Sequence, residues 1–284
     1  MNLATTSDEL NCAIERLRNS GVESPQLDSQ LMMAHALECS RLDLISHPER
    51  ELTAAQLESF RSMLDRRARR YPLAYIIGKK EFYGLLFDVT PEVLIPRPET
   101  EILVEECIKR AGDAPKIADV GTGSGAIAVT IAVNLPNARV WATDASESAL
   151  NVALANAQKH AVTDRVSITR GDLLEPLADF KFDMIVSNPP YIPSGDIDSL
   201  QIEVQFEPRE ALDGGVDGLD AYRRLLTQAI GIARIVALEI GAGQAESVVR
   251  IAEDAGWGCV AVVNDLSGIE RVVLCFDQKS EACQ

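Results

Sequence analysis

The stretch NPPY, formed by Asn188, Pro189, Pro190 and Tyr191, is the part of this sequence best suited to chemistry. It follows FDMIVS, a short apolar run with β-branched members that predicts a buried strand. The side-chain oxygen of Asn188 and the backbone carbonyl of Pro189 can each accept one N–H of an –NH₂ group, and Tyr191 can stack on a planar group. Two fixed acceptors would orient a nitrogen lone pair for in-line attack. The alternative interpretation is a stiff loop, because proline ends strands and Asn-Pro favours a turn.

A glycine-rich loop lies upstream, in IADVGTGSGAIAV, between a predicted strand and a predicted helix. Glycines at this place permit a tight turn and close approach of a ligand to the backbone. The loop consists of Gly121, Thr122, Gly123, Ser124 and Gly125. It also fits the dinucleotide pattern G-x-G-x-x-A, and Asp144 follows at about the spacing of a ribose-binding acid. NAD is therefore a competing ligand for this loop.

Asp119 argues against a dinucleotide, because a carboxylate at the strand end, facing the loop, would oppose a pyrophosphate. It suits S-adenosylmethionine, which has a cationic amino-acid group and no phosphate. Asp144 could then accept both ribose hydroxyls, and Asp172 could accept from the adenine amino group. Each acid alone could be a helix cap or a loop residue, and for Asp172 the two interpretations are evenly balanced. Three acids at the carboxyl ends of successive strands, beside a glycine loop, favour the cofactor site.

The elements that must position these residues alternate from Glu99 onward. Helical segments separate the short apolar runs KIADV, RVWATD, VSITRGD and FDMIVS, which predicts βαβ units and a parallel sheet with helices on both faces. The final stretch, GCVAVVNDLSGIERVVLCFD, contains two strands joined by a short polar turn. No helix fits between them, so we expect the last strand to be antiparallel.

The chain before this region divides into two further parts. Residues 1–71 are predicted to be wholly helical, with capping boxes at Thr6 and Glu9 and at Thr53 and Gln56. Residues 72–96 form a connector that is expected to contain a small β-hairpin. Residues 97–284 are then expected to form the catalytic domain.

Composition excludes several classes of protein. No apolar run reaches the roughly 18 residues that a membrane helix needs, and the N-terminus lacks the features of an export signal. Six scattered cysteines and three dispersed histidines indicate a reduced, cytoplasmic protein without a metal site. Residues 1–80 hold equal numbers of basic and acidic side chains, so the formal net charge of −16 falls on the remainder. Such a surface repels phosphate backbones, which disfavours a nucleic-acid substrate.

Four stretches together resemble the HemK/PrmC-type protein-(glutamine-N5) methyltransferases: FYGLLFDVTPEVLIPRPETE, ADVGTGSGAIA, VSNPPYI and FEPREALDGGVDGLDAYRRL. Members of this family methylate the glutamine of the Gly-Gly-Gln motif in class-one peptide chain release factors. The resemblance covers the whole chain. It implies a Rossmann-like class I S-adenosylmethionine-dependent fold with a mostly parallel seven-stranded sheet, whose last strand is antiparallel, and an N-terminal helical domain that helps to dock the release factor.

The resemblance also implies roles for individual residues. Cofactor contacts are expected along Gly121–Gly125 and at Asp144, Asp172 or the adjacent Leu173, and Asn188. Substrate contacts are expected along Asn188–Tyr191, with Arg97, Pro98, Glu99 and Thr100 at the entrance. One departure is visible: the family's pGG turn is missing before RIVALEIG, which leaves that helix-to-strand loop open.

Alternative functions remain at this point. NPPY is shared with amino-methyltransferases that act on adenine in nucleic acid, and close relatives methylate a glutamine of a ribosomal protein. A non-catalytic module that binds a partner through its helices is a further possibility. The best case for an RNA contact is the run Arg66, Arg67, Arg69 and Arg70, although such runs usually form a solvated helix face. We expect a monomer with a release factor as its protein substrate.

Overall fold

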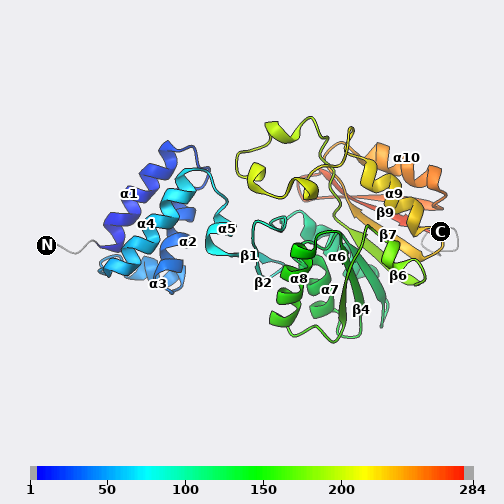
Figure 1. Cartoon of the computed structure of the whole chain (residues 1–284), viewed down its shortest axis with the longest axis horizontal. Helices are drawn as coiled ribbons and strands as arrows, with labels where there is room; N and C mark the ends of the chain where they lie inside the picture. Colours follow the sequence, from blue (N-terminus) through cyan, green and yellow to red (C-terminus); the bar gives the residue numbers. More distant parts are fainter. Residues whose placement is uncertain (1–4, 278–284) are drawn as a thin grey trace. The chain divides into compact units, whose positions relative to one another are not determined.

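The computed structural model describes residues 5–277, and the chain divides into two compact units (Figure 1). The helical unit comprises the chain up to Gly78 together with Gln201–Phe206. The sheet unit comprises Lys79–Leu200 and the chain from Glu207 onward. The division falls at Gly78 rather than at Tyr71, because residues 73–77 form a further helix of the helical unit.

The helical unit has a single apolar core. Its helices are α1 (Thr6–Asn19), α2 (Pro25–Ala36), α3 (Arg41–Ser46), α4 (Ala54–Ala68) and α5 (Leu73–Ile77). Phe60, Met32 and Leu17 are fully buried in this core. The Thr53–Gln56 capping box is present as predicted. The cap of α1 lies one residue earlier than predicted, at Thr5, because the hydroxyl of Thr6 is buried and donates to the carbonyl of Arg50.

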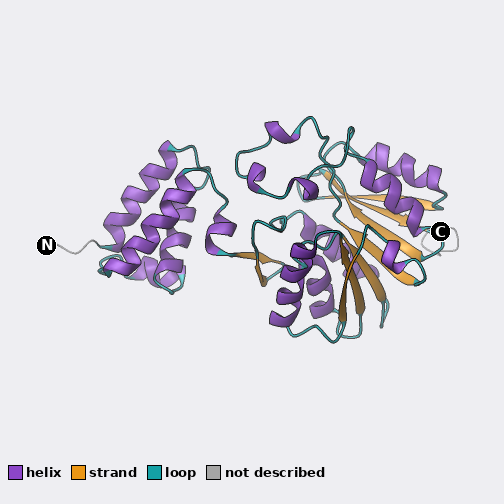
Figure 2. Ribbon diagram, viewed as in Figure 1, coloured by secondary structure: helices purple, strands orange, loops and turns teal. Residues whose placement is uncertain are grey.

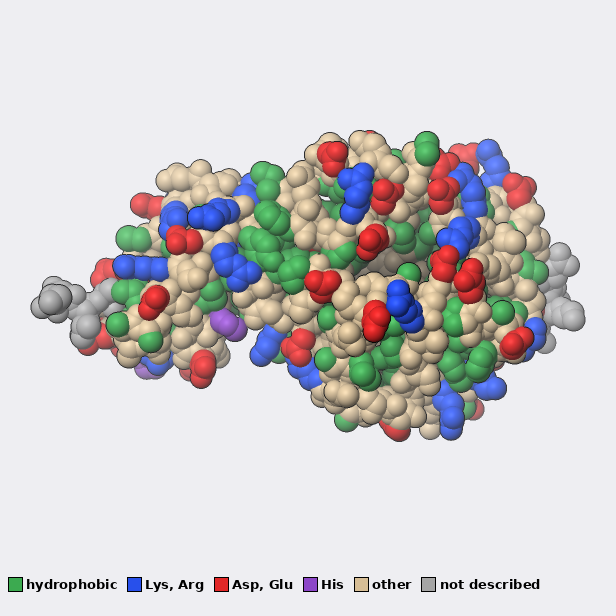
Figure 3. Space-filling model, viewed as in Figure 1, with side chains coloured by type: hydrophobic (Ala, Val, Ile, Leu, Met, Phe, Trp, Pro, Cys, Tyr) green, Lys and Arg blue, Asp and Glu red, His purple; other side chains and the backbone are tan. Residues whose placement is uncertain are grey.

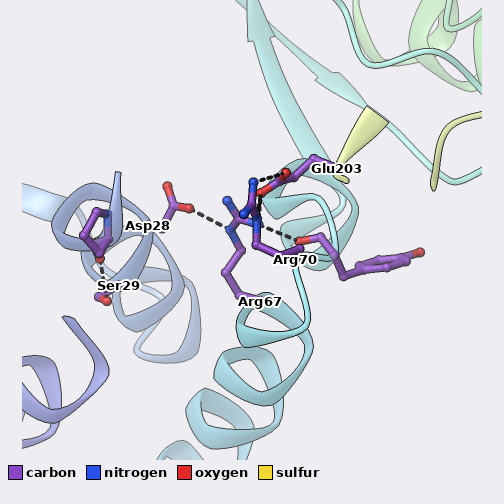
Figure 4. Close-up of polar contacts among 7 residues, drawn as sticks. Asp28, Ser29, Arg67, Arg70 and Glu203 are labelled. Atoms are coloured by element: carbon purple, nitrogen blue, oxygen red, sulfur yellow. Dashed lines mark hydrogen bonds and ion pairs between the residues drawn. The ribbon is translucent and has the colours of Figure 1, made fainter. Parts of the chain in front are cut away.

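The basic run at the end of α4 and directly after it is engaged in internal contacts (Figure 4). Arg67 is buried, and its Nε donates to Asp28 Oδ2 at 2.7 Å. Arg70 holds both carboxylate oxygens of Glu203, with Nε–Oε1 and Nη2–Oε2 distances of 2.5 and 2.7 Å, and Arg67 Nη1 adds a third bond of 2.9 Å. Arg66 lies over the ring of Tyr71. Two of the four arginines therefore fix residues 201–206 to the helical unit.

The sheet unit begins with the predicted hairpin and continues into a seven-stranded sheet of order β5-β4-β3-β6-β7-β9-β8. β9 is antiparallel to both β7 and β8, whereas β3 to β7 pair in parallel, so the predicted fold class is confirmed. The strands are β1 (Lys79–Phe82), β2 (Leu85–Asp88), β3 (Lys116–Val120), β4 (Arg139–Asp144), β5 (Val166–Arg170), β6 (Phe182–Ser187), β7 (Ala233–Glu239), β8 (Cys259–Asn264) and β9 (Glu270–Phe276). The helices are α6 (Thr100–Arg110), α7 (Ala126–Asn134), α8 (Glu147–Lys159), α9 (Asp220–Ala229) and α10 (Ala245–Ala255).

Helices cover both faces of this sheet (Figure 2). Alternate strand residues enter two apolar clusters, one with α6 and α7 and the other with α9 and α10. Ile117 of β3 belongs to the first cluster, whereas its neighbour Ala118 belongs to the second. The sequence did not predict the structure of the short loop before β7, where the family's pGG turn is missing. In the structure Gly231 makes this turn, with a φ of 72° that only glycine adopts easily.

Candidate active site

A cavity of about 760 Å³ lies at the carboxyl ends of β3, β4, β5 and β6. This volume is within the range of small-molecule sites. The strand order reverses at β3, which pairs with β4 on one side and β6 on the other. Open α/β sheets bind ligands at such a reversal point. The cavity therefore lies where the sequence predicts the cofactor.

The glycine loop supplies an open wall of this cavity. Gly121 and Gly123 line it, with φ values of 73° and 54°, and a Cβ atom added to either would meet no neighbour within 4 Å. Gly125 has a different role, because an added Cβ would lie 3.1 Å from the Cα atom of Ala153 in α8. Two glycines thus leave space for a ligand, and the third permits close helix packing.

Other predicted loop residues lie beneath this surface. Thr122 and Ser124 are buried, and neither lines the cavity. The carbonyl of Ser124 accepts a 2.8 Å bond from the fully buried side chain of Asn156, which also bonds the backbone of Asp88. This anchor holds the loop to α8 and β2, and the sequence analysis did not identify it.

Asp144 lies on the cavity wall at the end of β4. Its Oδ2 accepts from the backbone N–H of Gly123 at 2.9 Å, and its Oδ1 accepts from that of Ser146 at 2.9 Å. Each carboxylate oxygen has a further lone-pair site. Asp144 can therefore hold the loop and still accept from a pair of ligand hydroxyls.

Asp119 does not line the cavity, contrary to the expected contact with the cofactor. Side chains alternate along β3, so its carboxylate points toward the first turns of α7. There its Oδ2 accepts from Thr122 Oγ1 at 2.6 Å and from the backbone N–H of Ala128 at 3.1 Å. Complete burial raises the pKa of Asp119 to about 7. Asp119 thus braces the glycine loop from below, and the argument that it rejects a pyrophosphate loses its geometric basis.

Asp172 and Leu173 both line the cavity. Asp172 Oδ2 forms an ion pair with Arg224 Nη2 of α9 at 2.5 Å, and Arg224 lines the cavity as well. No motif in the local sequence marks Arg224 as a residue of this site. Leu173 has a positive φ of 50°, unusual for a branched residue and a mark of local strain at functional sites.

Asn188 lies on the cavity wall directly after β6. Its Nδ2 donates to the hydroxyl of Thr100, the first residue of α6, at 3.1 Å. With the amino group tied to Thr100, Oδ1 remains on the opposite side of the planar carboxamide as an acceptor. The structure thus brings Asn188 to the same cavity as the glycine loop and Asp144.

The rest of NPPY is closely surrounded by backbone. Pro190 lines the cavity, whereas Pro189 and Tyr191 do not. A Cβ atom on Gly214 would lie 2.8 Å from the carbonyl oxygen of Pro190, and one on Gly218 would lie 2.3 Å from that of Tyr191. The same Tyr191 carbonyl accepts from Gln244 Nε2 at 3.0 Å.

The stretch FEPREALDGG folds back along the exit of NPPY. Ile192 forms a parallel bridge with Asp213, and the N–H of Ser194 donates to the carbonyl of Gly215 at 2.8 Å. Glu207 of the same stretch is buried and joins it to LIPRPETE, because its Oε1 accepts from Arg97 Nη2 at 2.5 Å. Arg97, Pro98 and Glu99 do not themselves line the cavity.

Two other features of the described residues bear on function. Residues 5–277 contain no group of three or more side chains able to hold a metal ion. In the same part of the chain, no helix is both long and apolar enough to cross a membrane. Cys283 lies outside the described residues.

Comparisons with known proteins agree with this architecture. Residues 8–78 match the PrmC N-terminal domain family, and residues 98–206 match the methyltransferase small domain family. The chain resembles the solved structure of a methyltransferase from Pyrococcus furiosus, with a TM-score of 0.54 over 75% of this chain and 98% of that chain at 20% identity. The human Mettl16 catalytic domain gives a TM-score of 0.58 over 77% of this chain and 83% of that chain at 17% identity. These structural likenesses establish the fold.

Curated relatives define the family. The protein of Moorella thermoacetica named release factor glutamine methyltransferase is 45% identical over 96% of this chain and 98% of its own length. The protein of the same name from Geobacter sulfurreducens is 44% identical over 90% of this chain and 91% of its own length. At this level of identity along nearly the full length of both chains, the present chain belongs to the release factor glutamine methyltransferase family.

Proposed function

We propose that the protein transfers a methyl group from S-adenosylmethionine to the side-chain amide nitrogen (N5) of the glutamine in the Gly-Gly-Gln motif of class-one peptide chain release factors. The observation that carries the proposal is the carboxamide of Asn188, which lines the cavity and donates its amino group to Thr100. The names of the full-length relatives indicate the protein substrate.

The cavity residues fit the cofactor. Gly121 and Gly123 leave open space where a side chain would otherwise stand, and Asp144 offers paired oxygens for ribose hydroxyls. Asp172 and Leu173 would border the adenine. When bound, S-adenosylmethionine supplies an electrophilic methyl group on a positively charged sulfur.

The residues of NPPY would then orient the acceptor. An amide nitrogen is a weak nucleophile because its lone pair is delocalised. Asn188 Oδ1 and the carbonyl of Pro189 would each accept one N–H of the glutamine side chain, which turns the lone pair toward the methyl group. The new N–C bond forms as the C–S bond breaks and its electron pair goes to sulfur. The nitrogen becomes acidic as it gains the methyl group, so its proton can leave without a dedicated base.

The protein surface favours a protein substrate over nucleic acid. The formal net charge is −16, and acidic and basic side chains are interspersed over the face of the sheet unit seen in Figure 3. In the helical unit, Arg67 and Arg70 are neutralised by Asp28 and Glu203. We infer a cytoplasmic enzyme, because release factors, which the names of its relatives indicate as substrate, act in translation. We further propose that it acts as a monomer, with the cavity in the sheet unit as its complete catalytic site. The PrmC-like helical unit would help to dock the release factor.

Incubation with a labelled methyl donor and separate candidate substrates tests the proposal. The candidates are a class-one release factor, ribosomal proteins and adenine-containing RNA and DNA, and mass mapping locates the methyl group. We expect label on the Gly-Gly-Gln glutamine and turnover reduced by about 10²-fold in Asn188→Ala. Asn188→Asp keeps an acceptor oxygen, so we expect it to exceed Asn188→Ala. Label on another substrate alone, or unchanged turnover in Asn188→Ala, would overturn the proposal.

A further inference from the structure

Glu239 is a buried carboxyl group beside NPPY that the mechanism above does not use. Strands β6 and β7 are parallel, with Ser187 beside Leu238, so Asn188 and Glu239 follow as neighbours at the same sheet edge. Glu239 is 2% exposed, and its Oε2 atom has no hydrogen-bond partner among the described residues. A buried carboxyl oxygen without a partner is costly, and such groups are often functional.

Strand alternation places Asn188 and Glu239 on the same face of the sheet. Val186 and Ala237 belong to the apolar cluster that contains α6 and α7, and the two polar residues lie two positions further along their strands. Helix α6 begins on this side with Thr100. The N-terminal end of α6 therefore lies at the carboxyl ends of β6 and β7.

The hydroxyl of Thr100 connects the two side chains. It accepts from Asn188 Nδ2 at 3.1 Å, and it also interacts with the carboxyl group of Glu239. A hydroxyl has one proton to donate. When that proton is directed to an ionised Glu239, the oxygen lone pairs of Thr100 are left to face Asn188.

We propose that Glu239 is a positioning residue that acts through Thr100 to hold the carboxamide of Asn188 with its oxygen toward the acceptor nitrogen. The inference rests on the proposed function and assigns a further residue to that reaction. A carboxamide is nearly symmetrical in shape, so packing alone does not distinguish its oxygen from its amino group. A reversed carboxamide would present N–H groups to the acceptor –NH₂ and would lose the orienting hydrogen bond.

The charge state of Glu239 makes this arrangement depend on pH. Burial raises its pKa to about 7, and the charge of Glu99 adds to this effect, whereas Thr100, Arg271 and Arg97 oppose it. Burial also raises the pKa of nearby Tyr191 to about 12, so that phenol stays neutral. Below pH 7 a protonated Glu239 can donate its own O–H to the oxygen of Thr100. The Thr100 proton is then free to turn to Asn188, which favours the reversed carboxamide with its oxygen toward Thr100. We therefore expect turnover to fall as the pH drops through about 7.

Kinetics of four proteins test whether Glu239 acts on Asn188 through Thr100, an arrangement that we call the relay. The four are the wild type, Glu239→Gln, Thr100→Val and Thr100→Ser. Turnover is measured with saturating donor and release factor on both sides of pH 7, and calorimetry with S-adenosylhomocysteine controls for folding and cofactor binding. We expect kcat of Glu239→Gln and Thr100→Val to be about tenfold lower than that of the wild type. We also expect both variants to lack the acid limb of the pH profile, which is the fall in kcat below pH 7. Thr100→Ser should keep both. An unchanged acid limb in Glu239→Gln, or full turnover in Thr100→Val, would overturn the inference.

A second measurement needs no methyl acceptor. NMR of ¹⁵N-asparagine-labelled protein follows the side-chain amide of Asn188, which we expect to shift with a midpoint near pH 7 in the wild type and not in Thr100→Val. This response without release factor methylation would support the relay and contradict the proposed function. Methylation of the release factor without a pH-dependent shift of the Asn188 amide would support the proposed function and contradict the relay.

Discussion

Glu203 should control whether residues 201–206 stay attached to the helical unit, and Glu203→Gln tests this directly. The carboxylate accepts three short bonds from Arg70 and Arg67, and its side chain is 19% exposed. Glutamine has nearly the same shape but cannot match two charged guanidinium groups. Arg67 would keep its bond to Asp28, whereas Arg70 would lose its ion pair with Glu203 and turn toward water.

The pKa of Glu203 gives the magnitude. Burial alone would raise it, but the bonds from Arg70 and Arg67 outweigh burial and lower the pKa from 4.5 to about 2. A shift of this size corresponds to about 3 kcal/mol, and solvent screening places the expected loss at about 1–3 kcal/mol. Because the folded-state pKa is the lower one, this stabilisation is present above pH 4.5 and is lost as the pH falls toward 2.

Hydrogen exchange of the backbone amides of Val204 and Phe206 measures the effect. Both amides donate within the segment, to Gln201 and Glu203, so they exchange when it opens. At neutral pH we expect exchange to be about 10- to 100-fold faster in Glu203→Gln, with the difference shrinking below pH 4.5. Glu246→Gln is the matched control, because its exposed pair with Arg250 contributes little. Equal exchange in wild type and Glu203→Gln would refute the attachment.

Two further predictions concern the cavity wall. In calorimetry, Asp144→Ala should weaken binding of S-adenosylmethionine by about 1–3 kcal/mol, and Asp144→Asn should have an intermediate effect. Unchanged binding in both variants would show that Asp144 does not contact the cofactor. Gly123→Ala should preserve the melting temperature more than Gly125→Ala, because only the latter brings a Cβ to 3.1 Å from the Cα of Ala153. Gly123→Ala should nevertheless weaken cofactor binding, since its methyl group enters the cavity. The opposite order of melting temperatures would contradict these glycine roles.

Local patterns predicted the fold well. The alternation of short apolar runs with helical segments specifies a parallel sheet, and the short polar turn before Glu270 leaves no room for a crossover helix, so β9 is antiparallel. The polar residues at the carboxyl ends of β4, β5 and β6 reach one cavity for the same reason. Asp119 shows where a pattern of strand ends is insufficient, because the two-residue period of β3 also decides which face of the sheet a side chain enters. That period directs it away from the cavity and under the loop.

Long-range partners could not be predicted in this way. Glu203 lies 133 residues from Arg70, and Glu207 lies 110 residues from Arg97. Nothing in the local sequence distinguishes these glutamates from solvated loop residues. Glu239 carries a weak signal, because a charged residue ends the apolar run RIVALE beside the cavity edge, yet its neighbour Thr100 lies in another part of the chain.

The glycines of DGGVDG allow the backbone of NPPY to be held in a fixed geometry, as the proposed function requires. A side chain at Gly214 or Gly218 would collide with the carbonyl oxygen of Pro190 or Tyr191, at 2.8 and 2.3 Å. The backbone of this second stretch therefore packs directly on the backbone of NPPY, and the Ile192–Asp213 bridge fixes their register. Close backbone packing on Pro190 and Tyr191 restricts the chain directly after Pro189, whose carbonyl is the proposed acceptor. The proposed function orients a weak nucleophile and would need this rigidity, so under that proposal the DGGVDG stretch supports the active site by holding NPPY in place.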